Sequence, residues 1–302
     1  MVAYAVCQVF DLPIPLPTSK LNGPMIDTHQ HLIEPNRFHY PWLVEVPQLQ
    51  DTFDLPLYLS KTSDTAISGT IFMEVDVAPE DQAAEAAHFC ELADDPSTSL
   101  LGVIAGCRPE HDDFAEQVRR LKHPKLVGLR RILHTVDEAI GKSDLFRGNI
   151  ATLADHNLTF DLCVRPDQLL TAIEIVNAAP QTVFVLDHCG NPPMADKKAL
   201  ANWQEDIAHL ADLPNVSCKV SGLVNNLADT TDTITSLRPV VEYVAAHFGP
   251  ERLLFGGDWP VCLLANTELS SWTSIARTLL SDQSEKVQNA FFTENARRIY
   301  HL

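Results

Sequence analysis

Eight short apolar segments, separated by stretches with helical spacing, constrain the fold of this chain more than any other feature. Each segment is rich in Val, Ile, Leu or Phe and is often bounded by Gly or Pro, which is typical of strands buried on both faces. Eight such strands alternating with helices over 302 residues predict one closed parallel (β/α)8 (TIM) barrel of the α/β class. A doubly wound open sheet is the alternative, and the missing Gly-rich dinucleotide motif after the first strand weakens it. The predicted strands are 25–31, 67–77, 100–108, 126–133, 158–165, 182–189, 216–223 and 252–259.

The first 23 residues differ from the rest of the chain. They carry Pro13, Pro15, Pro17 and Gly23, and repeated proline breaks regular structure. We therefore expect an N-terminal arm at 1–23, followed by a single barrel domain at 24–302. Helices are predicted between the strands at 79–92, 112–121, 166–177, 200–211 and 237–248.

Charge and cysteine content exclude several classes of partner and compartment. A formal net charge of −18 argues against nucleic acid and against an anionic membrane surface, although a few local Arg residues could still make a pocket for an anionic substrate. The seven cysteines form no CxxC motif, and their odd number predicts free thiols in a reducing compartment. The N-terminus lacks the pattern of a signal peptide, and no run approaches the ~18 apolar residues of a membrane span. We expect a cytoplasmic protein that acts on a small molecule, with a homo-oligomer left open.

Polar residues at the predicted carboxyl ends of three strands suggest a reaction centre, because catalytic groups of a (β/α)8 barrel lie there. His29 and His31 end the first strand, and residues at i and i+2 share one face. His188 follows the apolar run of the sixth strand, and Asp258 follows two glycines in the eighth. Two imidazoles side by side form half of a metal site or a pair of carbonyl-polarising groups, and a buried carboxylate rarely lacks a partner. We predict that all four residues are catalytic.

Further polar groups near strand ends are candidate substrate contacts, with a structural ion pair as the alternative for each. Adjacent strand residues face opposite ways, so only one of Arg130 and Arg131 can face the barrel mouth. We expect that one, together with Arg165, to hold substrate hydroxyls or a carboxylate. Trp42, in the loop after the first strand, is expected to cover the site unless it packs in the core. The predicted substrate-binding residues are Arg130, Arg131, Arg165, Trp42 and Asp161, and other polar strand-end residues are Glu74, Asp76, Lys219 and Ser221.

The order of these motifs resembles the amidohydrolase-2 branch of the amidohydrolase superfamily. The resemblance rests on His-Gln-His at 29–31, Asp-His-Cys-Gly-Asn-Pro at 187–192 and Gly-Gly-Asp-Trp-Pro at 256–260, and it runs from about residue 25 to the end. Within that branch the chain is similar to the sugar lactonases, the L-fuconolactonase and L-rhamnonolactonase group. Segments 26–31, 40–43, 160–166 and 295–300 carry this finer similarity. The resemblance implies an amidohydrolase-type barrel and a hydrolase.

The chain departs from the wider superfamily at the fifth strand. Metal-dependent members usually carry a His at the end of that strand, where this chain has Asp161-Leu162-Cys163. A conventional zinc site would therefore lack a ligand, and the resemblance to 2-pyrone-4,6-dicarboxylate lactonases leaves catalysis without metal open. We expect either no required cofactor or one weakly held divalent ion, such as zinc, bound by His29 and His31 with Glu74 or Asp258.

These expectations combine into a lactonase that opens the ring of a lactone, most simply that of a sugar acid. Asp258 acts as general base for water and then protonates the leaving oxygen, while His29, His31 and His188 stabilise the oxyanion directly or through a metal. A metal-dependent decarboxylase of the same branch is the alternative enzyme, and the missing fifth-strand His argues against its metal site. A barrel that only binds a small ligand is the third alternative, and the presence of all four catalytic candidates argues against it.

Overall fold

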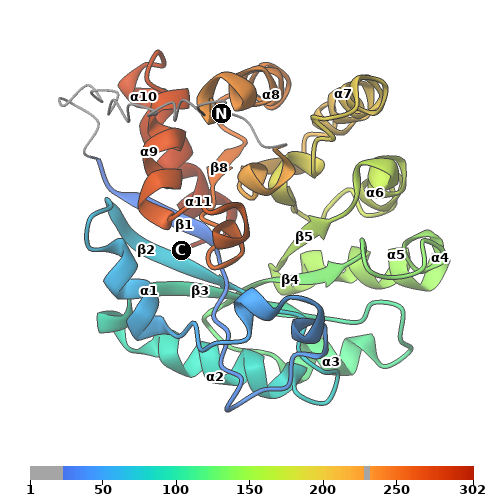
Figure 1. Cartoon of the computed structure of the whole chain (residues 1–302). Coiled ribbons are helices and arrows are strands. Elements are labelled where there is room, and N and C mark those ends of the chain that lie inside the picture. Colours follow the sequence, from blue (N-terminus) through green and yellow to red (C-terminus); the bar gives the residue numbers. More distant parts are fainter. Residues whose placement is uncertain (1–22, 228–231) are drawn as a thin grey trace, which may run out of the picture.

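Eight parallel strands form one sheet in the sequential order β1 to β8, with the helices around its outside (Figure 1). The computed structural model describes residues 23–227 and 232–302. The architecture is the predicted (β/α)8 barrel, and each strand lies within one of the eight predicted segments. The strands are β1 (Met25–Gln30), β2 (Ile67–Met73), β3 (Leu100–Gly106), β4 (Leu126–Ile132), β5 (Thr159–Cys163), β6 (Phe184–Leu186), β7 (Val216–Val220) and β8 (Leu253–Phe255).

The five predicted helices correspond to α2, α3, α6, α7 and α8, with bounds that shift by a few residues. The helix α7 begins three residues earlier than predicted because the Asp196 carboxylate accepts hydrogen bonds from the backbone N–H groups of Lys198 and Ala199. The helices are α1 (Leu55–Thr62), α2 (Gln82–Asp94), α3 (Phe114–Arg120), α4 (Ala139–Lys142), α5 (Asp144–Ala151), α6 (Leu169–Ala178), α7 (Lys197–Ala211), α8 (Thr233–Phe248), α9 (Leu269–Leu279), α10 (Glu285–Asn289) and α11 (Asn295–Ile299).

The barrel closes between β8 and β1 at the carboxyl ends of these strands. Gln30 forms a parallel bridge with Trp259. The backbone N–H of Asp258 donates to the carbonyl of His29, and the N–H of His31 donates to the carbonyl of Trp259, each over 2.8 Å. Closure of the barrel therefore places Asp258 directly beside the two histidines of β1.

The interior of the barrel is apolar toward the amino ends of the strands. Side chains such as Ile26, Ile71 and Leu254 pack there against Ile299 of α11. The helix α11 covers this end (Figure 1), and the amide of Asn295 donates to the carbonyl of Leu253 at the start of β8 over 2.8 Å. The site described below occupies the opposite end.

Two sequence predictions concern residues that are only partly described. Apart from Gly23, the predicted arm at 1–23 lies outside the described residues, as does Cys7. The six cysteines of the described part are buried and free, as predicted for them. Across 23–227 and 232–302, none of the helices combines the length and apolar character needed to cross a membrane.

Candidate active site

The carboxylate of Asp258 faces both histidines of β1 at the bottom of the barrel mouth. One of its oxygens, Oδ1, lies 3.7 Å from Nε2 of His29 and 3.6 Å from Nε2 of His31. The backbone of Asp258 has a φ of 54°, in the left-handed region that non-glycine residues enter rarely and mostly at functional sites. The strand β8 ends at Phe255, four residues earlier than predicted, and this conformation turns the carboxylate toward the histidines.

The glycine before Asp258 is required by a close approach of two strand ends. Its N–H donates to Oδ1 of Asp27 over 2.6 Å, and a Cβ at Gly257 would collide with Oδ2 of the same carboxylate. The other partners of Asp27 are the backbone N–H of His29 at 2.9 Å and the hydroxyl of Tyr58 at 2.7 Å. Asp27 thus ties the end of β1 to the loop that carries Asp258.

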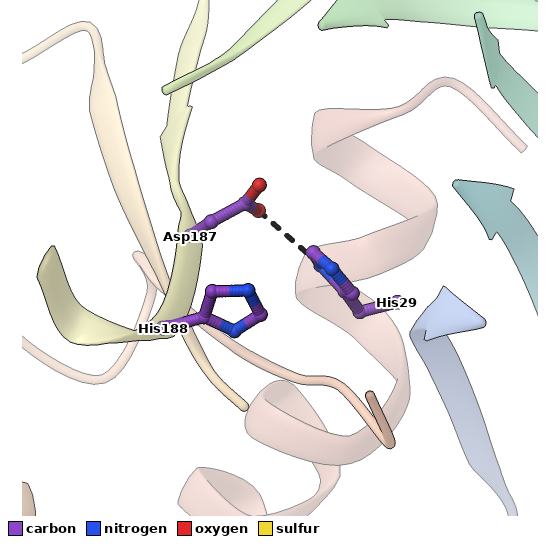
Figure 2. Close-up of side chains that lie close together, drawn as sticks. All are labelled: His29, Asp187 and His188. Atoms are coloured by element: carbon purple, nitrogen blue, oxygen red, sulfur yellow. Dashed lines mark ion pairs between the residues drawn. The ribbon is translucent and has the colours of Figure 1, made fainter. Parts of the chain in front are cut away.

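The outer ring nitrogens of the two β1 histidines each lie beside an acceptor. Nδ1 of His29 lies 3.3 Å from Oδ1 of Asp187, the ion pair drawn in Figure 2, and Nδ1 of His31 lies 3.0 Å from the carbonyl of Met73. Burial lowers the pKa of His29 well below its ordinary value and outweighs the opposing effect of Asp187, so this ring is neutral. With the proton on Nδ1, the lone pair of Nε2 points toward Asp258.

His188 lies beside this pair on a short turn after β6. Its backbone φ is 53°, which ends β6 earlier than predicted, and its ring centroid is 4.5 Å from that of His29 (Figure 2). The hydroxyl of Ser221 lies 2.9 Å from Nδ1 of His188 and fixes the ring by a hydrogen bond. A Cβ at Gly222 would come within 2.5 Å of the same nitrogen, so only glycine leaves room for the imidazole.

A buried arginine is locked beside the histidines by two carboxylates. Nε of Arg130 donates to Oε1 of Glu74 over 2.6 Å, and its Nη2 donates to the backbone carbonyl of Glu74 over 2.7 Å. Its Nη1 lies 3.3 Å from Asp187 and 3.4 Å from Nε2 of His29. Burial alone would raise the pKa of Glu74, but Arg130 outweighs it and holds that pKa below the ordinary value. The site therefore contains a fixed positive charge next to the histidines.

These groups border a cavity of about 320 Å³ at the barrel mouth. Trp42 forms part of the wall, and its indole N–H donates to the carbonyl of Val75 over 2.8 Å. Apolar side chains line the cavity together with a few amides, imidazoles and charged groups, a composition common in sites for small molecules. The residues around it include His31, Asp258, His188, Arg130, Trp42, Val75, Asp76, Ile132, His134, Cys163, Asn191, Asn225, Asn226 and Val261.

The comparisons with known proteins agree with this geometry. The amidohydrolase-2 family model, described as "Amidohydrolase", matches residues 26–302. The chain belongs to this family. The L-fucono-1,5-lactonase of Burkholderia multivorans is 32% identical over 291 residues, which cover 92% of this chain and 96% of that protein. The L-fucono-1,5-lactonase of Burkholderia ambifaria is 33% identical over 171 residues, or 56% of this chain and 58% of that one.

A solved structure extends the likeness to the whole barrel of this amidohydrolase-2 protein. The crystal structure of an amidohydrolase from Burkholderia multivorans, with bound zinc, superposes with a TM-score of 0.83 at 28% identity. The alignment covers 93% of this chain and 100% of that chain. The zinc ion belongs to the Burkholderia multivorans structure. Whether the present chain can hold such an ion depends on the geometry of its own residues.

The triad of His29, His31 and Asp258 fits a divalent cation. Its ligand atoms all lie within 4.8 Å of one another, and both imidazoles present Nε2 while an acceptor holds Nδ1. Three N and O ligands with an open position are typical of catalytic zinc sites, and second-shell acceptors orient their histidines in this way. A second group, His29 with Asp187 and His188, is also close enough (Figure 2), but Lys219 and Arg130 already contact its carboxylate and oppose a cation there.

Asp161 and Glu74 lie elsewhere than expected from the sequence, whereas Arg130 and Arg131 face opposite ways, as predicted for adjacent strand residues. Asp161 is fully buried below the cavity, where Nζ of Lys219 donates to its Oδ2 over 2.5 Å and the hydroxyl of Tyr300 donates over 3.0 Å, so it does not reach a ligand in the mouth. Glu74 forms an ion pair with Arg130 and belongs to neither of the two groups that could hold a metal ion, so we do not count it as a metal ligand. Arg131 faces the opposite way from Arg130 and pairs with Glu110 at 2.7 Å.

Several residues of the site were not singled out in the sequence. Asp187 orients His29 and carries an ionised carboxylate, because Lys219 and His29 hold its pKa well below the ordinary value although burial opposes them. An acidic residue at the end of the apolar run 183–186 was the available signal for it. His134, Asn225 and Asn226 border the cavity from loops after β4 and β7, and only the amide pair at the end of a strand could have suggested a role.

Proposed function

We propose that this family member hydrolyses the ring ester of a small lactone, most simply one derived from a sugar acid. One observation carries the proposal: a buried carboxylate, Asp258, faces two imidazole nitrogens within 3.7 Å at the edge of a ligand-sized cavity. The likeness to the two Burkholderia lactonases supports the choice of ester. The amides that line the cavity supply donors and acceptors for hydroxyl groups.

Asp258 is the general base of the proposed reaction. Burial would raise its pKa, but His188, His31 and His29 outweigh burial and hold the pKa below its ordinary value, so the group is ionised at neutral pH. The carboxylate takes a proton from the attacking water while the oxygen of that water bonds to the lactone carbonyl carbon. The same proton then passes from Asp258 to the ring oxygen as the C–O bond breaks, which gives the hydroxy acid.

Positive charge for the oxyanion comes from Arg130 and a hydrogen bond from His188. Both residues border the cavity, whereas His29 does not line it and its neutral ring, with the proton on Nδ1, directs no N–H group toward Asp258. Of the three imidazoles expected from the sequence to stabilise the oxyanion, we propose His188 for this hydrogen bond, and we add Arg130. A divalent ion held by His29, His31 and Asp258 would supply Lewis-acid polarisation of the carbonyl. We propose that it is held weakly, because Nη1 of Arg130 competes for the lone pair of His29.

The test is a panel of aldonolactones and aromatic-pathway lactones assayed with a pH indicator, because each hydrolysis releases a proton. Asp258→Asn should lower kcat by about 10²–10⁴-fold, the usual contribution of a general base, without a change in the unfolding transition. Asp282→Asn is the matched control, because that carboxylate is 83% exposed on the outer surface. Near wild-type turnover in Asp258→Asn, a far higher kcat/KM on an amide or phosphate ester, or release of CO2 from a carboxylate substrate would contradict the proposal.

A further inference from the structure

A second cavity adjoins the candidate active site and is not used by the proposed reaction. It measures about 450 Å³ and shares His134, Asn191 and Asn226 with the first cavity. Its remaining wall comes from the loop 192–196 and from Arg165 with Pro166. The two cavities therefore adjoin at these three side chains.

The residues at the junction are held in place by contacts that leave them facing the cleft. Sγ of Cys163 lies 3.3 Å from Nδ1 of His134, and Nη1 of Arg165 donates to the carbonyl of His134 over 2.8 Å. The amide nitrogen of Asn191 donates to the carbonyl of Val164 over 3.0 Å. Burial raises the pKa of the Cys163 thiol, so its hydrogen stays in place to contact the imidazole.

The outer wall is a rigid loop that begins directly after the catalytic turn of His188. Asn191-Pro192-Pro193 removes two backbone donors and fixes two φ angles. The N–H of Asp196 donates to the carbonyl of Pro193 over 3.0 Å, and its side chain caps α7. Such a wall is ordered before any ligand arrives, which reduces the entropy cost of binding.

The chemistry of this wall favours a neutral ring with hydroxyl groups. Pro192, Pro193 and Met194 offer apolar surface for the C–H face of a sugar ring, while Asn226 and His134 offer hydrogen bonds. A carboxylate is disfavoured, because Asp167 lies 3.0 Å from Nε of Arg165 and Asp196 adds a second negative charge to the same wall. The one guanidinium of this wall is thus already paired with Asp167, and Asp196 leaves the wall without a net positive charge.

We propose that the second cavity is a subsite for a glycosyl substituent, so that the preferred substrates are lactones of disaccharide aldonic acids. This inference rests on the proposed function, which places the lactone ring beside Asp258. The second ring passes the junction at His134 and Asn226 and lies against the loop 192–196. Water and the lactone still give one hydroxy acid, and the glycosidic bond remains intact.

The experiment compares glucono-1,5-lactone with its 4-O-glycosylated counterparts from cellobiose and maltose. The wild-type protein is expected to show at least a tenfold higher kcat/KM on a disaccharide lactone. Ala195→Trp, which fills the second cavity, should remove most of this preference and leave the glucono-1,5-lactone rate within about twofold of wild type. Ala201→Trp on the exposed face of α7 is the control and should change neither rate. A wild type without preference, or an Ala195→Trp protein that loses both activities equally, would overturn the inference.

A binding measurement separates this inference from the proposed function. Calorimetry on the Asp258→Asn protein with the stable acids, cellobionic or maltobionic against gluconic, requires no turnover. Tighter binding of a disaccharide acid that Ala195→Trp abolishes would support the subsite even if no lactone were hydrolysed. Hydrolysis of glucono-1,5-lactone with equal affinity for all the acids would support the lactonase and reject the subsite.

Discussion

The two ends of the barrel interior are built from opposite kinds of side chain. Toward the amino ends of the strands, Ile26, Ile71 and Leu254 belong to an apolar cluster that packs against α11. Toward the carboxyl ends, Lys219 and Arg130 are buried among several carboxylates and histidines. Truncation of an apolar side chain leaves a void whose cost grows with its volume. Removal of one buried charge leaves its partner uncompensated in a medium of low dielectric constant. The stability of the charged end therefore depends on each of its buried charged residues.

The largest expected effect on stability is at Lys219. Its ammonium is fully buried between Asp161 at 2.5 Å and Asp187 at 3.3 Å. Lys219→Met should lower the free energy of unfolding by about 3–5 kcal/mol, because two carboxylates lose their shared cation. Urea denaturation measures this, with Lys61→Met as the surface control. The ion pair of Lys61 with Glu268 is half exposed and is worth less than about 1 kcal/mol.

A double variant keeps this prediction testable if Lys219→Met does not fold. Asp161→Asn added to Lys219→Met removes one of the two unpaired charges and should restore part of the lost stability or soluble yield. Equal stability of the wild type and Lys219→Met would show that the buried charges at this end are not coupled.

The apolar end should respond to truncation in stability alone. Leu254 is fully buried in the interior cluster, and Leu254→Ala should cost about 2–5 kcal/mol in the free energy of unfolding. Because the cluster lies away from the mouth, kcat of the folded protein should stay within about twofold at a temperature well below its Tm. Leu264→Ala, at a site that is 40% exposed, is the control and should change stability by less than about 0.5 kcal/mol. A large loss of kcat in Leu254→Ala would show that the two ends are energetically linked.

The sequence predicts the apolar end and the strand order far better than the charged end. The eight strands follow from local composition, and the ends of two of them, β1 and β8, bring His29, His31 and Asp258 together. The left-handed backbone at His188 and Asp258 is set by long-range contacts with Ser221, Asp27 and the β1 backbone, so it leaves no local signature.

Local composition also does not show how deep within the barrel a side chain lies. Cys163 borders the cavity, whereas Asp161, two residues earlier on the same strand, lies below it and pairs with Lys219. A strand rises about 3.3 Å per residue, so two positions separate contact with a ligand from burial beneath it. The choice between a substrate contact and a structural ion pair at such a position depends on strand register, which becomes known only when the barrel closes.

A smaller effect is expected at Ser221, which acts through His188 rather than on substrate. Ser221→Ala removes the hydrogen bond to Nδ1 and should lower kcat by about tenfold or less, the equivalent of about 0.5–1.5 kcal/mol. The loss should appear in kcat more than in KM, because the ring is displaced while the cavity wall remains. Ser217→Ala on the same strand is the control. Unchanged kinetics in Ser221→Ala would remove the tethering of His188 from the mechanism.

The smallest effect is expected from removal of metal, because the charged end already contains its own cation. A tight catalytic zinc site has three protein ligands and water, and His29, His31 and Asp258 supply the three. The guanidinium of Arg130, however, lies 3.4 Å from Nε2 of His29 and is held there by Glu74, so a bound ion meets electrostatic repulsion and competition for one ligand. We expect chelation to remove any ion while most of kcat on a reactive lactone survives.

Metal content by mass spectrometry before and after chelation, paired with kcat, measures this. Asp206→Asn on α7 is a mock-ligand control that should leave metal content unchanged. Stoichiometric zinc whose removal eliminates activity, and whose return restores it, would show that Arg130 does not replace the ion.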